Sequence, residues 1–107
     1  MATTYFMDGK KNLPGRIVQL VSKTGAYTVD FKDDVIGCDA SGGDFIITLL
    51  AASDANGKIV YVKNTASTGQ VTVDGNSSET IDGELTQLVD PYECLAIVSD
   101  GSNWHII

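Results

Sequence analysis

The sequence has few of the residues on which metal sites, nucleic-acid surfaces and large aromatic cores depend. Its 107 residues include one histidine, two prolines and 7% aromatics, and 7 lysines and arginines stand against 14 acidic residues. The net charge of −7 disfavours contact with phosphate backbones. We therefore expect no nucleic-acid partner, and a single modest core filled mostly by Val, Ile, Leu and Ala.

The two cysteines form no metal or redox motif. Cys38 and Cys94 lie far apart, with no C-x-x-C pair and no cysteine–histidine ligand spacing. We interpret both as small, reduced core residues. A disulfide between them stays open, because sequence spacing does not establish a pairing.

Long hydrophobic runs are also missing. No stretch approaches the roughly 20 apolar residues of a membrane helix, and the opening MATTYFMDGKKNLPG lacks the apolar centre of a signal peptide. We expect no membrane insertion, and a protein that is made and kept in the cytoplasm until it assembles.

Short apolar runs separated by Gly, Asn, Asp and Ser are what the sequence does contain. This spacing predicts an all-β domain over residues 17–107, as a short-strand β-sandwich, a β-barrel-like fold or a solenoid-like stack. One helical turn is expected at residues 51–56, before Gly57. The expected strands are residues 17–21, 26–31, 35–38, 45–50, 58–63, 70–74, 85–89, 93–99 and 104–107.

Several of these runs are apolar on both faces. Val71 and Val73 alternate with polar residues, as expected for a half-buried strand. Residues 45–50, 58–63 and 95–98 instead place apolar side chains on both sides. A small domain has few elements with which to cover a second face, so this pattern predicts that identical subunits bury it.

The C-terminal residues 93–107 predict a closing β-hairpin, with a turn at Ser-Asp-Gly-Ser-Asn. Its second strand contains Trp104, Ile106 and Ile107. We expect these three residues to lie in the core or at a subunit interface, because an unprotected apolar end favours aggregation.

Catalytic patterns are not recognisable. The single histidine, His105, has no nucleophile turn nearby, and it is interpreted as an edge or interface residue. Most acidic residues stand beside glycines, as in turns. We therefore predict no enzymatic activity, no catalytic residue, no metal site and no cofactor. Tyr92, which follows Pro91 in a turn, is the aromatic residue best placed to contact a glycan.

The first 16 residues show no clear periodicity, and Leu-Pro-Gly at residues 13–15 interrupts the chain before the first expected strand. Such a terminus is often poorly ordered. However, Tyr5, Phe6 and Met7 form an apolar triplet, so a second interpretation is an N-terminal arm that attaches to a partner through these side chains.

The ordered segments YTVDFKDDVIGCDASGGDFIITLLAA, GKIVYVKNTASTGQVTVDG, ETIDGE and ECLAIVSDGSNWHII resemble the short trimeric β-domains of tailed-bacteriophage tail fibres. This resemblance covers about three quarters of the chain. It implies a virion structural protein that forms an intertwined homotrimer, contributes to host-cell attachment and contacts other virion proteins. It also implies assembly in the host cytoplasm and no shared catalytic residues. Because the chain begins with Met1, we expect a complete small protein or a deliberately cut fragment.

Two other functions stay open. A capsid-decorating or head-fibre protein would come from the same structural class, and a monomeric carbohydrate-binding module would bind host glycan through an exposed aromatic side chain. A polysaccharide-degrading spike fragment is the weakest alternative, because the sequence has no long repeat and no convincing acid pair.

Overall fold

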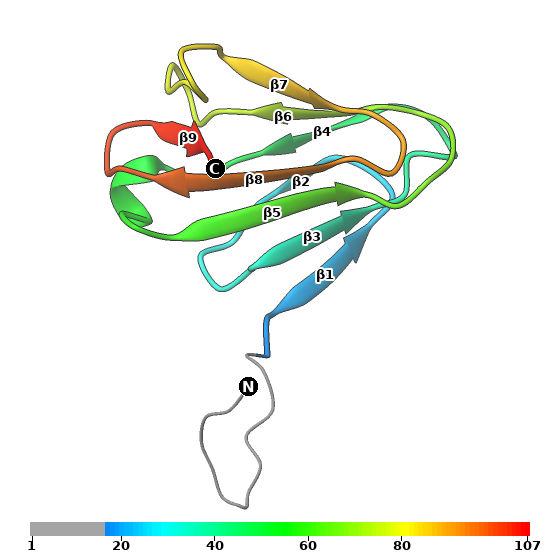
Figure 1. Ribbon diagram of the computed structural model, residues 1–107, viewed down its shortest axis with the longest axis horizontal. Coiled ribbons are helices and arrows are strands. Elements are labelled where there is room, and N and C mark those ends of the chain that lie inside the picture. Colours follow the sequence, from blue (N-terminus) through cyan, green and yellow to red (C-terminus); the bar gives the residue numbers. More distant parts are fainter. Residues whose placement is uncertain (1–16) are drawn as a thin grey trace, which may run out of the picture.

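The computed structural model describes residues 17–107, which contain nine strands in two sheets (Figure 1). The five-stranded sheet has the order β1-β3-β5-β8-β9, and the four-stranded sheet has the order β2-β4-β6-β7. The first contains β1 (Leu20–Lys23), β3 (Val35–Cys38), β5 (Ile59–Asn64), β8 (Cys94–Ser99) and β9 (Trp104–Ile106). The second contains β2 (Tyr27–Thr28), β4 (Phe45–Thr48), β6 (Val71–Asp74) and β7 (Thr86–Val89).

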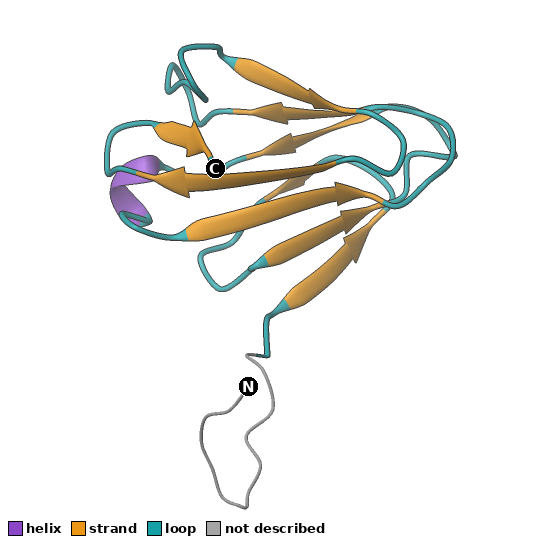
Figure 2. Ribbon diagram, viewed as in Figure 1, coloured by secondary structure: helices purple, strands orange, loops and turns teal. Residues whose placement is uncertain are grey.

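The first six strands alternate between the two sheets. Each passage from one sheet to the other adds a parallel strand, so β1, β3 and β5 run parallel in one sheet and β2, β4 and β6 run parallel in the other. The last three strands pair in antiparallel fashion: β7 with β6, β8 with β5 and β9 with β8. The result is a parallel stack whose C-terminal side is closed by antiparallel strands (Figure 2).

The core lies between the sheets and follows from the alternation of each strand. Val60 and Val62 of β5 are fully buried, as are Val71 and Val73 of β6. The predicted half-buried pattern of residues 70–74 is therefore confirmed. Burying each such side chain stabilises the fold by about 1.5–3 kcal/mol.

Each of the nine predicted strand regions overlaps a strand. The first strand begins later than predicted, at Leu20, and extends to Lys23. In residues 26–31, only Tyr27–Thr28 is a strand. The chain turns early because the buried Asp33 carboxylate accepts hydrogen bonds from the Tyr27 hydroxyl and the Asp30 backbone N–H. The predicted helical turn at 51–56 is confirmed as a short 3-10 helix, η1 (Ala52–Asp54).

The prediction that both cysteines lie in the core is wrong for one of them. Cys38 is fully buried, and burial raises the pKa of its thiol to about 11. Cys94 is exposed, because it stands opposite Lys63 and points away from the other sheet. Both thiols are free.

The predicted closing hairpin is confirmed, with Ile97 opposite Ile106 and Ser99 opposite Trp104. Its three apolar residues have different surroundings. Trp104 is fully buried, whereas Ile106 and Ile107 are 40% and 62% exposed. The two sheets remain separate over residues 17–107, so the fold is a two-sheet sandwich and does not close into a barrel.

Candidate interaction surface

The side of the five-stranded sheet that points away from the core is largely apolar, and we call it the outer face. Its central row crosses the sheet: Leu20 stands beside Val35, Val35 beside Tyr61, and Tyr61 beside Ala96. Ile107 continues this row, since its backbone N–H donates to the Ala96 carbonyl at 2.9 Å. The outer face consists of Leu20, Ser22, Val35, Gly37, Ile59, Tyr61, Lys63, Cys94, Ala96, Val98, His105 and Ile107.

A shallow groove extends this face at the start of β5. It has a volume of about 330 Å³. Ile17, Val18, Ile59 and Tyr61 form its apolar lining, and the Lys58–Asp34 pair forms its polar side. Ile17 is 89% exposed, the highest value among the large apolar side chains that the structure describes. A lone exposed apolar residue is ordinary, but a contiguous patch indicates an interaction site.

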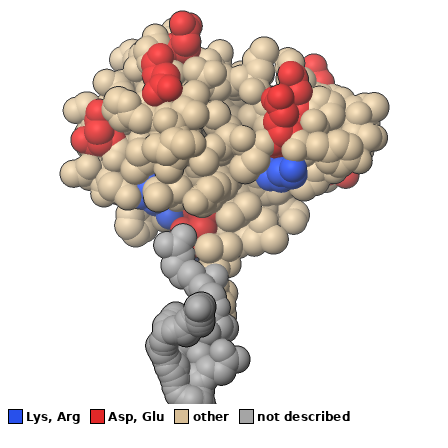
Figure 3. Space-filling view, viewed as in Figure 1, with Lys and Arg blue, Asp and Glu red and all other residues tan. Residues whose placement is uncertain are grey.

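Carboxylates are excluded from this sheet. The sequences of its five strands, LVSK, VIGC, IVYVKN, CLAIVS and WHI, contain no Asp or Glu, although the chain has 14 acidic residues. Lys63 and His105 are the two basic side chains on the outer face. In Figure 3 most of the visible acidic side chains lie toward the ends of the molecule, away from its middle.

The outward side of the four-stranded sheet is different. It presents Thr28, Thr48, Thr72, Thr86 and Asp74 across the four strands. The exposed apolar side chains of these strands are Ile46 and Leu88, and Thr72 stands between them in the register. The two sheets therefore have outward surfaces of opposite character, one apolar and one mostly hydroxylated.

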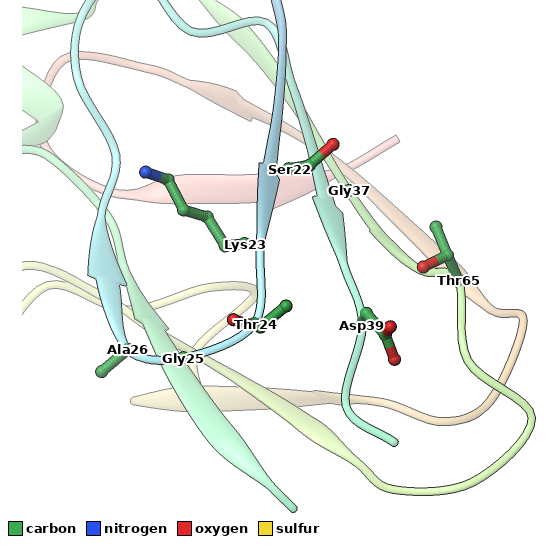
Figure 4. Close-up of a pocket in the computed structure, with 8 residues that line it drawn as sticks. All are labelled: Ser22, Lys23, Thr24, Gly25, Ala26, Gly37, Asp39 and Thr65. Atoms are coloured by element: carbon green, nitrogen blue, oxygen red, sulfur yellow. The ribbon is translucent and has the colours of Figure 1, made fainter. Parts of the chain in front are cut away.

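A polar hollow of about 510 Å³ adjoins the outer face at the carboxyl ends of β1 and β3 (Figure 4). Ser22, Thr24, Asp39 and Thr65 line it with hydroxyl and carboxylate groups, and Gly37 leaves space because it has no side chain. Lys23 projects to the opposite side of β1 in Figure 4, where its Nζ lies 4.0 Å from the centre of the Tyr27 ring. The hollow therefore offers hydrogen bonds but no aromatic platform.

Tyr92 lies at the turn between β7 and β8 and is 62% exposed. Its φ of 64° is unusual for a bulky residue, and such a conformation costs about 1–3 kcal/mol. The turn is held by a 2.9 Å hydrogen bond from the Glu93 N–H to the Asp90 carbonyl, and by Lys63 Nζ, which donates to the Tyr92 carbonyl. The ring is thus presented to solvent on a fixed turn.

His105 lies on β9 between two carboxylates. Its Nε2 is 2.6 Å from Asp100 Oδ2, and its Nδ1 is 3.7 Å from Asp82 Oδ1. The Asn103 backbone N–H and the His105 side chain lower the pKa of Asp100 to about 2. This arrangement fastens the closing hairpin to the preceding turn. The sequence analysis did not identify either carboxylate as a partner of His105, because neither is adjacent to it in the chain.

No group of three or more His, Cys, Asp and Glu side chains within residues 17–107 is placed to bind a metal ion. The same residues contain no helix long and apolar enough to cross a membrane. The proposed anchor residues Tyr5, Phe6 and Met7 lie outside the described part of the chain.

The chain matches no protein-family model, and its comparison with curated proteins and with solved structures also returns no match.

Proposed function

We propose that this protein is a structural component of a bacteriophage virion, a trimeric tail fibre or fibre tip that contributes to host-cell attachment. The observation that carries this proposal is the meeting of two segments of the family resemblance, residues 79–84 and 99–107. The Thr80 backbone N–H donates to Asn103 Oδ1 at 2.8 Å, and the Asp82 N–H donates to the Trp104 carbonyl at 3.0 Å.

These hydrogen bonds join two segments of the resemblance that are distant in the chain. The two segments are separated in the chain by β7 and β8, yet they form one cap on the closed side of the parallel stack. The packing of these two segments on one another supports the proposal, because it brings two parts of the resemblance into one place. Its expected partners are other copies of the chain, other virion proteins and host surface glycan.

The proposal is tested on purified particles of the phage that encodes the protein. Heads and tails are separated, and the protein is located by mass spectrometry and by immunogold labelling. We expect it in the tail fraction, and we expect the purified protein to compete with particles for adsorption to host cells. Its presence in the head fraction would support the capsid-decorating or head-fibre alternative, and its absence from particles would contradict a virion role.

The exposed ring of Tyr92 favours a second candidate function, recognition of a saccharide by stacking. Two variants distinguish stacking of the Tyr92 ring on a sugar from the need of this turn for a residue with positive φ. Tyr92→Phe keeps the aromatic face, whereas Tyr92→Asn removes the face but tolerates a positive φ. A carbohydrate-binding module would bind arrayed host glycans in the wild-type and Phe forms and lose binding in the Asn form. Equal binding by all three forms would exclude this role for Tyr92.

A further inference from the structure

We infer that the outer face of the five-stranded sheet is the surface through which copies of this chain meet. This inference deepens the proposed function and rests on it only for the number of copies. The surface itself is argued from the residues that the structure describes.

The first argument is the extent of the apolar surface. Neighbouring strands lie about 4.8 Å apart, so the sheet is roughly 20–25 Å wide. The central row from Leu20 to Ile107 crosses this whole width without a charged side chain. Leu20 and Ile107, at the two ends of the row, are 60% and 62% exposed. The three residues between them are partly exposed, and a contiguous apolar patch of this kind is typical of an interaction site.

The second argument is charge. Each copy of the chain carries a net charge of −7, so two copies repel one another unless their carboxylates stay apart. The five strands contain no carboxylate. The carboxylates at the margin of the face lie beside basic side chains: Asp34 is 3.0 Å from Lys58, and Asp100 and Asp82 are 2.6 and 3.7 Å from His105. The outer face is therefore the side on which copies approach with little repulsion.

The third argument distinguishes another copy from other occupants. A small molecule requires a concave site, whereas the centre of this face is an open sheet. An anionic membrane surface requires several Lys or Arg side chains, and the outer face has Lys63 alone. The same face of another copy matches it, because apolar sheet faces pack together through interdigitated side chains. Two such faces packed on one another give a dimer, whereas three faces turned toward a common axis give the trimer of the proposed function.

The experiment compares two substitutions to glutamate on opposite sides of the protein. Tyr61→Glu places a charge in the central row of the outer face, and Thr72→Glu places the same charge in the middle of the other sheet's outward side. Solution mass is measured by light scattering after size exclusion, over a range of protein concentrations. We expect wild type and Thr72→Glu at about three times 11.3 kDa, and Tyr61→Glu at the mass of one chain.

A folding defect in Tyr61→Glu is distinguished from lost assembly in two ways. Near-ultraviolet circular dichroism reports whether the core is intact, and Val98→Lys repeats the test on β8 with the opposite charge. Cys94 supplies a further readout, since it is an exposed thiol on the outer face whereas Cys38 is buried. We expect alkylation of Cys94 to slow as the wild-type concentration rises, but to stay fast in Tyr61→Glu.

The possible outcomes test the assembly role of the outer face and the proposed virion function independently. A wild-type monomer at all concentrations would overturn the inference, as would a folded Tyr61→Glu variant that keeps the wild-type mass. A dimer that Tyr61→Glu dissociates would support the surface and contradict the threefold assembly. A trimer that Tyr61→Glu dissociates, but that is absent from virions, would support the surface and contradict the virion role.

Discussion

Ile81 and Trp104 are joined by a parallel β-bridge, and both side chains are fully buried. Ile81 belongs to the turn region between β6 and β7, and Trp104 is the first residue of β9. The bridge therefore connects the region between two strands of one sheet to the edge strand of the other. It explains how a chain that crosses repeatedly between two sheets is closed on its C-terminal side.

The Trp104 side chain is expected to make a large contribution to stability. Its ring is the largest fully buried side chain in residues 17–107, and its indole Nε1 has no hydrogen-bond partner there. Trp104→Ala should lower the free energy of unfolding by about 3–5 kcal/mol, because it leaves a cavity. Trp104→Phe should cost less, since it keeps a ring and removes the unpartnered donor. Urea denaturation measures both, and equal losses would contradict this account.

Gly69 is required at a close backbone approach. Its φ is +89°, and an added Cβ would lie 2.0 Å from the Ala40 carbonyl oxygen. Gly69→Ala should destabilise the protein by more than about 1 kcal/mol, because the native conformation is incompatible with a side chain. Gly42→Ala is the matched control, since nothing lies within 4 Å of a Cβ there. Thermal unfolding should show a clear loss for the first variant and almost none for the second.

The hydrogen bond between Tyr27 and Asp33 makes stability sensitive to high pH. The phenol donates to the buried carboxylate at 2.5 Å, and this bond is the main reason that the pKa of Tyr27 rises to about 12 from 10.0. A raised pKa favours the neutral phenol in the folded state, so its contribution is complete below pH 10 and is lost as the pH rises toward 12.

Tyr27→Phe tests this relationship. The variant should lose about 1–3 kcal/mol of stability at neutral pH, because the Asp33 carboxylate loses a donor. Between pH 10 and 12 the difference from wild type should shrink, as measured by denaturant midpoints at each pH. A constant difference across that range would show that the phenol does not titrate as the structure indicates.

Asp100 should make the closing hairpin sensitive to acid. Its pKa is lowered to about 2 from 3.8, first by the Asn103 backbone N–H and then by the His105 side chain. A lowered pKa means that the contribution is present above about pH 4 and is lost as the pH falls toward 2. Asp100→Asn should therefore flatten the pH dependence of stability between pH 4 and 2. Asp54→Asn, at an exposed position in η1, is the control for the loss of one carboxylate.

The N-terminal apolar triplet is predicted to attach the protein to the rest of the particle. Replacing Tyr5, Phe6 and Met7 together with serine should leave the solution mass and thermal stability of the purified protein unchanged. Incorporation into particles should fall strongly, because the triplet would supply most of the apolar contact. Particles grown with the variant and analysed by mass spectrometry provide the measurement. Normal incorporation would mean that attachment lies elsewhere in the chain.

The local features of this fold were predictable from the amino-acid sequence. Side chains alternate between the two faces of a strand, so the order of apolar and polar residues fixes where a strand runs and which side chains share a face. Val71 and Val73 were assigned to one buried face on this basis, and Val35–Cys38 was predicted with the bounds that the structure has. The same reasoning identified the closing hairpin, because its turn residues lie between two short apolar runs.

Only the tertiary structure decided which strands pair and which side chains lie on the outward face of each sheet. The parallel pairing of β3 with β5, the bridge from Ile81 to Trp104, and the carboxylates around His105 all join residues that are distant in the chain. Cys94 was assigned to the core, but it is exposed because its side chain, like that of its cross-strand neighbour Lys63, lies on the outward side of the sheet. A strand's sequence determines its two faces, whereas the partners and the face that is covered depend on how all the strands together bury apolar surface and satisfy their hydrogen bonds.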